Sequence, residues 1–202
     1  MNEIPPITFQ SLQGEAIVPW LDDIARLRID VFRDWPYLYK GDVAYEADYL
    51  RTYTQAPRSI AVLAMQGEVV VGASTGLPMD EEAAAFRAPL EAAGIDTARV
   101  FYCGESVLLP AYRGRGIGHA FFDAREAHAR ALGGFDLCAF AAVDRAAGDP
   151  RRPPGHRDND AFWTRRGYRR SDIAMQLPWN EVDRGEVDHT LTFWLRPLEE
   201  TR

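Results

Sequence analysis

The sequence contains few of the residues that build disulfide scaffolds or metal centres. Among its 202 residues there are only two cysteines, Cys103 and Cys138, and the four histidines are scattered without an HExxH-type pair. Two cysteines are too few for a disulfide framework, and no spacing of cysteine and histidine is typical of metal ligands. We therefore expect two buried, reduced thiols and no metal site.

Long apolar runs and an excess of basic charge are also missing. No stretch of about 18 uncharged apolar residues is present, and the first ten residues, MNEIPPITFQ, lack the basic and apolar regions of a signal peptide. The formal net charge of -7 argues against a nucleic-acid partner, because such a partner requires a basic surface. These absences predict a cytoplasmic protein without membrane or nucleic-acid contacts, and they leave a homodimer open.

The sequence does contain an alternation of strand-like and helical segments, which is typical of the α/β class. A hydrophobic content of 47% is sufficient for one core, so we predict a single domain spanning residues 1–202. Helices are expected at 20–32, 46–55, 80–94 with an interruption at Pro89, 116–134 and 158–167. Strands are expected at 59–65, 69–75, 100–109, 135–143, 168–179 and 189–198.

Two segments depart from this alternation. An aromatic-rich helical elaboration occupies residues 34–55, and a loop rich in proline and arginine occupies 144–158. The arginines of this loop either form a solvated connection or reach a ligand phosphate. They are Arg145, Arg151, Arg152 and Arg157. The helix at 116–134 is expected to bury Ile117, Phe121, Ala124, His128 or Ala127, and Leu132. The helix at 158–167 is expected to start at Asp158 or Asn159.

Three glycines and two arginines are crowded into the stretch SVLLPAYRGRGIGHAFFDA, residues 106–124. A strand that turns through glycines into a helix leaves backbone N–H groups unpaired and directs partial positive charge outward. Such a turn binds anions, and Arg113 and Arg115 add full charges, so the segment predicts a phosphate or pyrophosphate ligand. It is no Walker loop, because His119 and Ala120 follow the last glycine, and no register fits the dinucleotide pattern GxGxxG.

The pattern Arg-x-x-Gly-x-Gly, formed by Arg113, Gly116 and Gly118, resembles the acetyl-CoA signature of the GNAT N-acetyltransferase superfamily. The order of predicted elements and the segment NDAFWTRRGY, residues 159–168, are similar to that family too. The resemblance implies a mixed, mostly antiparallel sheet with a splayed central parallel pair and helices on both faces. It also implies acetyl-CoA as co-substrate.

The resemblance further implies which residues hold acetyl-CoA. The backbone of the splayed strand would bind the pantetheine arm, the glycine turn would bind the pyrophosphate, and the second signature would flank the arm. The residues so implied are Ser106, Val107, Leu108, Arg113, Gly114, Arg115, Gly116, Ile117, Gly118, Asn159 and Phe162.

The position at which many members of the family carry a tyrosine acid is occupied here by Trp163. An indole N–H is no general acid at neutral pH, so water or another residue would have to protonate the departing thiolate. Attack requires a neutral amine, and Glu105 and Tyr102 are the candidates for the group that accepts its proton. The alternatives are that Glu105 is a surface or salt-bridged carboxylate and that Tyr102 belongs to the core.

Aromatic residues gather in the segment that borders the acceptor cleft in this family. Trp35, Tyr37 and Tyr39 are the candidate acceptor-binding residues, and a hydrophobic cap over the core is the alternative interpretation. The resulting hypothesis is an N-acetyltransferase that acetylates a primary amine of a small molecule or peptide by direct attack in a ternary complex. A GNAT-fold module that binds acyl-CoA without turnover, or an unrelated α/β nucleotide-binding protein, remains as an alternative.

Overall fold

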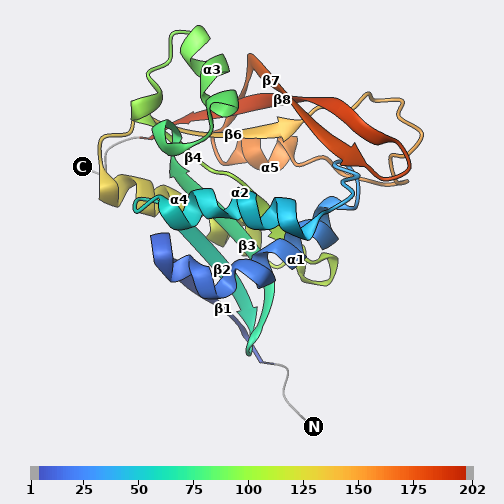
Figure 1. Cartoon of the computed structure of the whole chain (residues 1–202), viewed down its shortest axis with the longest axis horizontal. Coiled ribbons are helices and arrows are strands. Elements are labelled where there is room, and N and C mark those ends of the chain that lie inside the picture. Colours follow the sequence, from blue (N-terminus) through green and yellow to red (C-terminus); the bar gives the residue numbers. More distant parts are fainter. Residues whose placement is uncertain (1–4, 199–202) are drawn as a thin grey trace.

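The fold is built around one mixed β-sheet, and the computed structural model describes residues 5–198 of the chain (Figure 1). The sheet order is β1-β2-β3-β4-β6-β8-β7, and β5 pairs with β3 beside this path. The β4–β6 pair is parallel and the other pairs are antiparallel. The strands are β1 (Ile7–Leu12), β2 (Ile60–Gln66), β3 (Val69–Pro78), β4 (Val100–Tyr102), β5 (Ser106–Leu108), β6 (Leu137–Val143), β7 (Arg169–Glu181) and β8 (Gly185–Pro197).

Helices cover both faces of this sheet (Figure 1). α1, α2 and α3 contribute to one apolar cluster, whereas α4 and α5 contribute to a second cluster on the opposite face. The helices are α1 (Leu21–Phe32), α2 (Val43–Gln55), α3 (Ala84–Ala92), α4 (Ile117–Leu132) and α5 (Asp160–Arg165). Short 3-10 turns are η1 (Gly14–Trp20), η2 (Met79–Glu81), η3 (Thr97–Arg99) and η4 (Pro110–Tyr112). The predicted α/β class, with a mostly antiparallel sheet and one parallel pair, is confirmed.

Most predicted elements are present. The helices expected at 20–32 and 46–55 are α1 and α2, and the strands expected at 59–65 and 69–75 form the antiparallel hairpin β2–β3. The strand β6 lies in the middle of the sheet, with apolar residues on both faces, as its nearly continuous apolar sequence indicates. The closing strands β7 and β8 are longer than expected and form one hairpin.

Three predictions about the elements were wrong. β1 was not foreseen, although its pairing with β2 forms one edge of the sheet. The helix expected at 80–94 starts only at Ala84, and Pro89 lies inside it without an interruption. The proline removes one N–H donor, but its carbonyl still accepts a hydrogen bond from the Ala93 amide (3.2 Å), so the helix continues past it. The strand expected at 100–109 is broken into β4 and β5.

The buried face of α4 also differs from the prediction. Phe122, Arg125 and Glu126 point into the protein beside Ile117 and Phe121. The apolar residues of the helix predicted that Ala124 and Leu132 would be buried, but Leu132 is 38% exposed. Charged side chains are tolerated on the inward face of this helix because they form hydrogen bonds with other groups in the core.

Candidate active site

The sheet opens beyond the end of β4, where β5 no longer pairs with β6. Tyr102 at the end of β4 pairs with Ala139 of β6, and the amide of Cys103 then donates a hydrogen bond to the Ala139 carbonyl (2.7 Å). Beyond that point β5 pairs with β3, so within the described residues Ser106–Leu108 has one edge without a partner strand. A free strand edge offers N–H and C=O groups to an extended ligand. Ser106 is exposed and Val107 is buried.

The glycine turn lies directly after this open strand. Gly114 and Gly116 have φ angles of 76° and 81°, which favour glycine, and a Cβ atom on either would meet no other atom within 4 Å. Among the described residues, no hydrogen bond is donated by the amides from Gly114 to Gly118. The turn is therefore an open backbone cradle at the N-terminus of the 16-residue helix α4.

Basic side chains stand beside this cradle. Arg113 and Arg115 are both exposed. The Arg115 guanidinium lies 5.3 Å from the ring centroid of Tyr112 and donates a hydrogen bond to the Ala111 carbonyl (3.0 Å). The turn thus combines free amides, the helix dipole and two cations, which suit a phosphate or pyrophosphate.

The second predicted signature lies against the first. Phe162 of α5 is the nearest residue to Gly118, since a Cβ atom there would be 3.5 Å from the Phe162 ring. The Phe162 ring also contacts His119, with the ring centroids 4.9 Å apart. Asn159 occupies the N-cap position of α5, but its side chain forms no capping hydrogen bond. Residues far apart in sequence therefore flank the start of α4 together.

Trp163 belongs to an aromatic cluster of the sheet. Its ring centroid lies 4.9 Å from that of Phe140 on β6 and 5.2 Å from that of Trp194 on β8. The side chain is half-buried. These contacts make Trp163 a packing residue of the sheet.

Glu105, in the link between β4 and β5, is a buried and ion-paired carboxylate. Its Oε2 lies 2.7 Å from Arg28 Nη1 and accepts a hydrogen bond from the Tyr49 hydroxyl (3.1 Å). Arg28 is buried too, stacks on the Tyr49 ring at 4.1 Å and also pairs with Glu46. In contrast, Glu105 Oε1 is buried without a hydrogen-bond partner in the part of the chain described. One oxygen of this carboxylate is held by Arg28 and Tyr49, whereas the other has no hydrogen-bond partner among the described residues.

Hydrogen bonds and close packing fix the backbone around Glu105. Arg125 of α4 is 1% exposed, and its Nη1 donates hydrogen bonds to the carbonyls of Glu105 (3.1 Å) and Thr75 (3.2 Å). At Gly104 a Cβ atom would lie only 2.0 Å from the Tyr53 hydroxyl, so this position has no room for a larger residue. These contacts fix the bend that separates β4 from β5.

Tyr102 and Glu82 are two further buried titratable residues whose charges interact with that of Glu105. Burial raises the pKa of the Tyr102 hydroxyl well above its ordinary value, and the neighbouring Tyr53 and Glu82 raise it further. Glu82 follows η2 and is 5% exposed. Burial raises its pKa to about 7, and the charge of Glu105 adds to this effect while Arg28 opposes it. Tyr102 also packs its ring against Phe86 of α3.

The candidate acceptor residues line the segment that follows α1. Trp35 and Tyr39 are each 9% exposed, and Tyr37 is half-buried. Tyr37 packs against Phe32 with tilted rings whose centroids are 4.4 Å apart, and burial raises its pKa to about 12. Of the tyrosines on α2, Tyr49 and Tyr53 point inward, whereas Tyr45 is 54% exposed.

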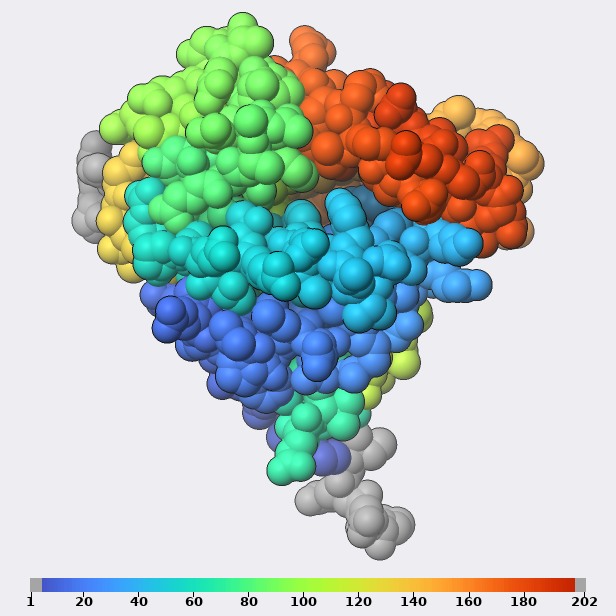
Figure 2. All heavy atoms as spheres, viewed as in Figure 1, coloured from blue at the N-terminus to red at the C-terminus, as the bar shows by residue number. Residues whose placement is uncertain are grey.

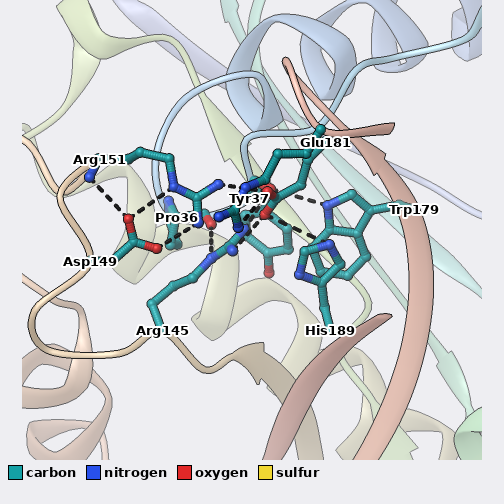
Figure 3. A network of polar contacts seen from close by, with 9 residues as sticks. Pro36, Tyr37, Arg145, Asp149, Arg151, Trp179, Glu181 and His189 are labelled. Carbon is teal, nitrogen blue, oxygen red and sulfur yellow. Dashed lines mark hydrogen bonds and ion pairs between the residues drawn. The ribbon is translucent and has the colours of Figure 1, made fainter. Parts of the chain in front are cut away.

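A buried ionic network holds this segment against the β7–β8 hairpin (Figure 3). Glu181 is fully buried and pairs with Arg145 and Arg151, at 2.6 Å in each case. Arg145 also donates hydrogen bonds to the carbonyls of Pro36 (2.6 Å) and Tyr37 (2.9 Å). Burial alone would raise the pKa of Glu181, but the hydrogen bonds from the two arginines outweigh it and lower that pKa.

The same contact is reinforced by the backbone and by a hydrogen bond from an indole ring. The amide of Lys40 donates to the Asn180 carbonyl, and the amide of Val182 donates to the Leu38 carbonyl, both at 2.7 Å. Trp179 donates its indole N–H to the Tyr37 carbonyl (3.1 Å). Residues 36–40 are thus joined to the hairpin by main chain and side chains alike.

A hollow lies between α2 and the β7–β8 hairpin, and Figure 2 shows it as a depression between the cyan and red bands. α3, in green, rises at one end of this depression, and the segment after α1 approaches the hairpin at the other end. The hydrogen bonds described above close that second end.

The loop 144–158 is therefore more than a solvated connection. Arg145 and Arg151 bind Glu181, and Arg152 pairs with Asp158 (2.6 Å). Each of these guanidinium groups forms an ion pair with a carboxylate of the protein.

Several of these residues were missed from sequence: Arg28, Glu46, Glu82, Arg125 and Glu181. Arg28 falls on the apolar stripe of α1 beside Ile24 and Leu27, and that position could have marked it as inward-facing. Glu82 carries no such signal, because it follows Asp80 and Glu81 in an acidic run that suggests solvent exposure.

Residues 5–198 contain neither clustered metal ligands nor a membrane-spanning helix. No group of three or more histidine, cysteine, aspartate or glutamate side chains is arranged to hold a metal ion there. None of the helices in this range combines the length and apolar character needed to cross a bilayer. Both cysteines are free and buried, as predicted, and hydrogen bonding from Cys138 lowers the pKa of Cys103 to about 7.

Comparison with known proteins links this geometry to one family. Residues 21–153 match the model described as the Acetyltransferase (GNAT) family. No curated protein is significantly similar to the chain in sequence.

Solved structures share the fold at low sequence identity. The ribosomal-protein-S18-alanine N-acetyltransferase from Escherichia coli has a TM-score of 0.59 at 11% identity, covering 98% of this chain and 97% of its own. Arabidopsis thaliana NAA60 in complex with acetyl-CoA has a TM-score of 0.60 at 12% identity, covering 95% of this chain and 98% of its own. The GphF GNAT-like decarboxylase in complex with isobutyryl-CoA has a TM-score of 0.59 at 18% identity, covering 95% of this chain and 100% of its own.

Proposed function

The chain belongs to the GNAT acetyltransferase family, and from this premise we propose that it is a single N-acetyltransferase domain. It transfers the acetyl group of acetyl-CoA to a primary amine by direct attack in a ternary complex. The observation that carries the proposal is the break between β4 and β5. This break leaves the open strand edge of Ser106–Leu108 between Glu105 and the glycine cradle in the chain.

Acetyl-CoA fits the strand edge and the glycine cradle. The free edge of Ser106–Leu108 would bind the amides of the pantetheine arm, with Phe162 beside it. The free amides from Gly114 to Gly118 would bind the pyrophosphate, and Arg113 and Arg115 would neutralise its charge. The positive φ angles and the empty space at Gly114 and Gly116 support this placement, because the backbone is accessible only while these side chains are absent.

We assign proton transfer to residues at the bend between β4 and β5. Glu105 Oε1 would receive a proton from the incoming ammonium group, directly or through water, and Tyr102 is the neighbouring hydroxyl. Trp163 would take no part, since it packs in the sheet, so water is left to protonate the CoA thiolate.

The acceptor is a small amine in this proposal. A polypeptide that presents an internal lysine would need a groove that is open at both ends, whereas residues 36–40 and the β7–β8 hairpin are joined by hydrogen bonds across one end. Trp35, Tyr37 and Tyr39 lie in or beside this bridged segment. Acidic and aromatic groups around the hollow suit a cationic amine.

A module that binds acyl-CoA without turnover is the second candidate. The position of Trp163 favours it, because this chain lacks a phenol there. A screen of small amines, amino acids, polyamines and short peptides with acetyl-CoA decides between the two, with free thiol read against a control without acceptor. We expect release with at least one small amine and none above the control with peptides whose only free amine is that of an internal lysine. If no amine raises thiol release above the control, the non-catalytic module is favoured.

A further inference from the structure

Arg28 of α1 lies between two buried carboxylates. Its Nε donates a hydrogen bond to Oε2 of Glu46 on α2, and its Nη1 lies 2.7 Å from Oε2 of Glu105, in the link between β4 and β5. The side chains of Glu46 and Glu105 are 0% and 3% exposed, and that of Arg28 is 9% exposed. Three parts of the chain thus bring two negative charges and one positive charge into direct contact inside the protein.

The guanidinium group of Arg28 also packs against aromatic rings. Its Cζ lies 4.1 Å from the ring centroid of Tyr49 and 5.1 Å from that of Phe32. A planar guanidinium that forms hydrogen bonds at its edge and ring contacts with its face is held in one orientation. The direction in which Nη1 points toward Glu105 is therefore fixed by the fold.

The oxygen of Glu105 that contacts Arg28 has a second donor. The Tyr49 hydroxyl donates a hydrogen bond to Oε2 (3.1 Å) and lies 3.2 Å from the Tyr53 hydroxyl. Burial raises the pKa of Tyr49 well above its ordinary value, and the charge of Glu105 raises it further, so this hydroxyl remains a donor at neutral pH. Both donors bind Oε2, whereas Oε1 has no hydrogen-bond partner among the described residues.

The charges of this cluster do not cancel. Glu46 and Glu105 share one guanidinium, and neither forms another ion pair in the part of the chain that the structure describes. A buried excess of negative charge is costly unless a further cation approaches it. The sharing of Arg28 therefore leaves Glu105 able to attract an ammonium group.

Other titratable groups also act on Glu105 through their charge. They belong to the segment after α1, to α2, to the residue after η2 and to β4, and they are Tyr37, Tyr53, Glu82 and Tyr102. Within residues 5–198, only Arg28 and Tyr49 lie within hydrogen-bonding distance of the Glu105 carboxylate. These two residues therefore control its orientation.

We propose that Arg28 is the positioning residue of Glu105 and that Glu46 holds Arg28 in place. This inference rests on the proposed function, in which Glu105 Oε1 accepts a proton from the acceptor amine. Because Arg28 and Tyr49 bind Oε2, the carboxylate cannot rotate and Oε1 remains the free oxygen. The cation also favours the ionised carboxylate, which is the form that accepts a proton. Glu46 opposes this second effect, since its negative charge offsets part of that of Arg28.

The test measures kcat as a function of pH with the small amine that gives the highest rate. The rise of kcat at the acidic end of the profile reports the ionisation of Glu105. In Arg28→Gln this rise should move to higher pH by about one to three units, because the nearby cation is lost. Tyr49→Phe keeps the ring but loses one hydrogen bond to Oε2, so the rise should move in the same direction by a smaller amount. Glu46→Gln removes a negative charge, so the rise should move to lower pH.

The maximum of kcat and the KM for acetyl-CoA complete the test. Arg28→Gln should lower the maximal kcat by about tenfold or more, because Oε1 is no longer oriented, and it should leave the KM for acetyl-CoA unchanged. Arg26→Gln is the matched control, because Arg26 lies on the same helix but forms an exposed pair with Asp23 (2.6 Å). It should retain the rate and the pH profile of wild type.

Two of the variants decide the inference even where Arg28→Gln does not fold. Tyr49→Phe and Glu46→Gln both retain the ion pair between Arg28 and Glu105. An active wild type whose acidic rise stays in place in either variant, or moves in the same direction in both, would overturn the positioning role alone. A wild type that acetylates no amine would overturn the proposed function and this inference together.

Discussion

Two buried glutamates, Glu105 and Glu82, differ in their polar partners. Arg28 and Tyr49 hold one oxygen of Glu105. Glu82 has no cation within hydrogen-bonding distance in the described part of the chain, and a single amide binds one of its oxygens. Burial therefore raises the pKa of Glu82 to about 7.

The raised pKa of Glu82 predicts a dependence of stability on pH. Because this pKa is about 7 in the folded protein and 4.5 for an ordinary glutamate, the folded state favours the protonated form. The free energy of unfolding therefore falls as pH rises from about 4.5 to 7, and the full penalty is present above that range. Glu82→Gln removes the penalty, so it should be more stable than wild type at about pH 8, by up to about 3 kcal/mol.

Urea unfolding of the two proteins at about pH 5 and pH 8 measures this effect. The advantage of Glu82→Gln should shrink toward the lower pH, whereas Glu81→Gln should show no such trend, because Glu81 precedes Glu82 in the chain but pairs with Arg58 (2.6 Å). A stability difference that is the same at both pH values would mean that Glu82 is ionised throughout this range.

The start of α4 is the element whose role was clearest in the sequence. The glycine turn and the helix that follows were predictable because each depends on neighbouring residues: glycine permits the positive φ, and the helix supplies free amides. The break between β4 and β5 was not predictable. It depends on Arg125 and Tyr53, which reach the bend from α4 and α2, and a sequence does not show that these residues meet Glu105 and Gly104.

A valine at Gly116 tests the cradle at the start of α4. Gly116→Val forces a branched side chain into a φ of 81° and places it where the pyrophosphate would lie, so the melting-temperature increase caused by acetyl-CoA should be lost. Gly94→Val is the matched control, because Gly94 follows α3 with a φ of 79° and equally empty surroundings.

Both valine variants should lose about 1–2 kcal/mol of stability. The control should retain the response to acetyl-CoA. A Gly116→Val protein that binds acetyl-CoA as tightly as wild type would place the ligand elsewhere on the molecule.

Across the whole molecule, the hollow depends on segments that are far apart in the sequence. The segment after α1, the loop 144–158 and the β7–β8 hairpin meet at Glu181 (Figure 3). The sequence indicated the aromatic residues and the arginines, but not that a single carboxylate joins them, because the pairing spans most of the chain.

Glu181→Gln tests whether this network shapes the acceptor site. The substitution leaves Arg145 and Arg151 without their buried counter-charge, and it should cost about 3 kcal/mol of stability. The KM for the amine should rise while the KM for acetyl-CoA stays unchanged, since the glycine cradle lies elsewhere in the fold. Glu186→Gln, an exposed position of the same hairpin, should alter neither. Equal increases in both KM values would show that the network supports the fold in general.

The central claim is that the chain moves an acetyl group from acetyl-CoA to an amine. The most direct measurement is mass spectrometry of the best small amine after incubation with wild type and CoA thioester carrying a deuterated acetyl group. The account predicts an acceptor that carries the deuterated acetyl group on its nitrogen, formed together with an equal amount of free CoA. An unlabelled acceptor, in a sample whose melting temperature is raised by the same thioester, would contradict it.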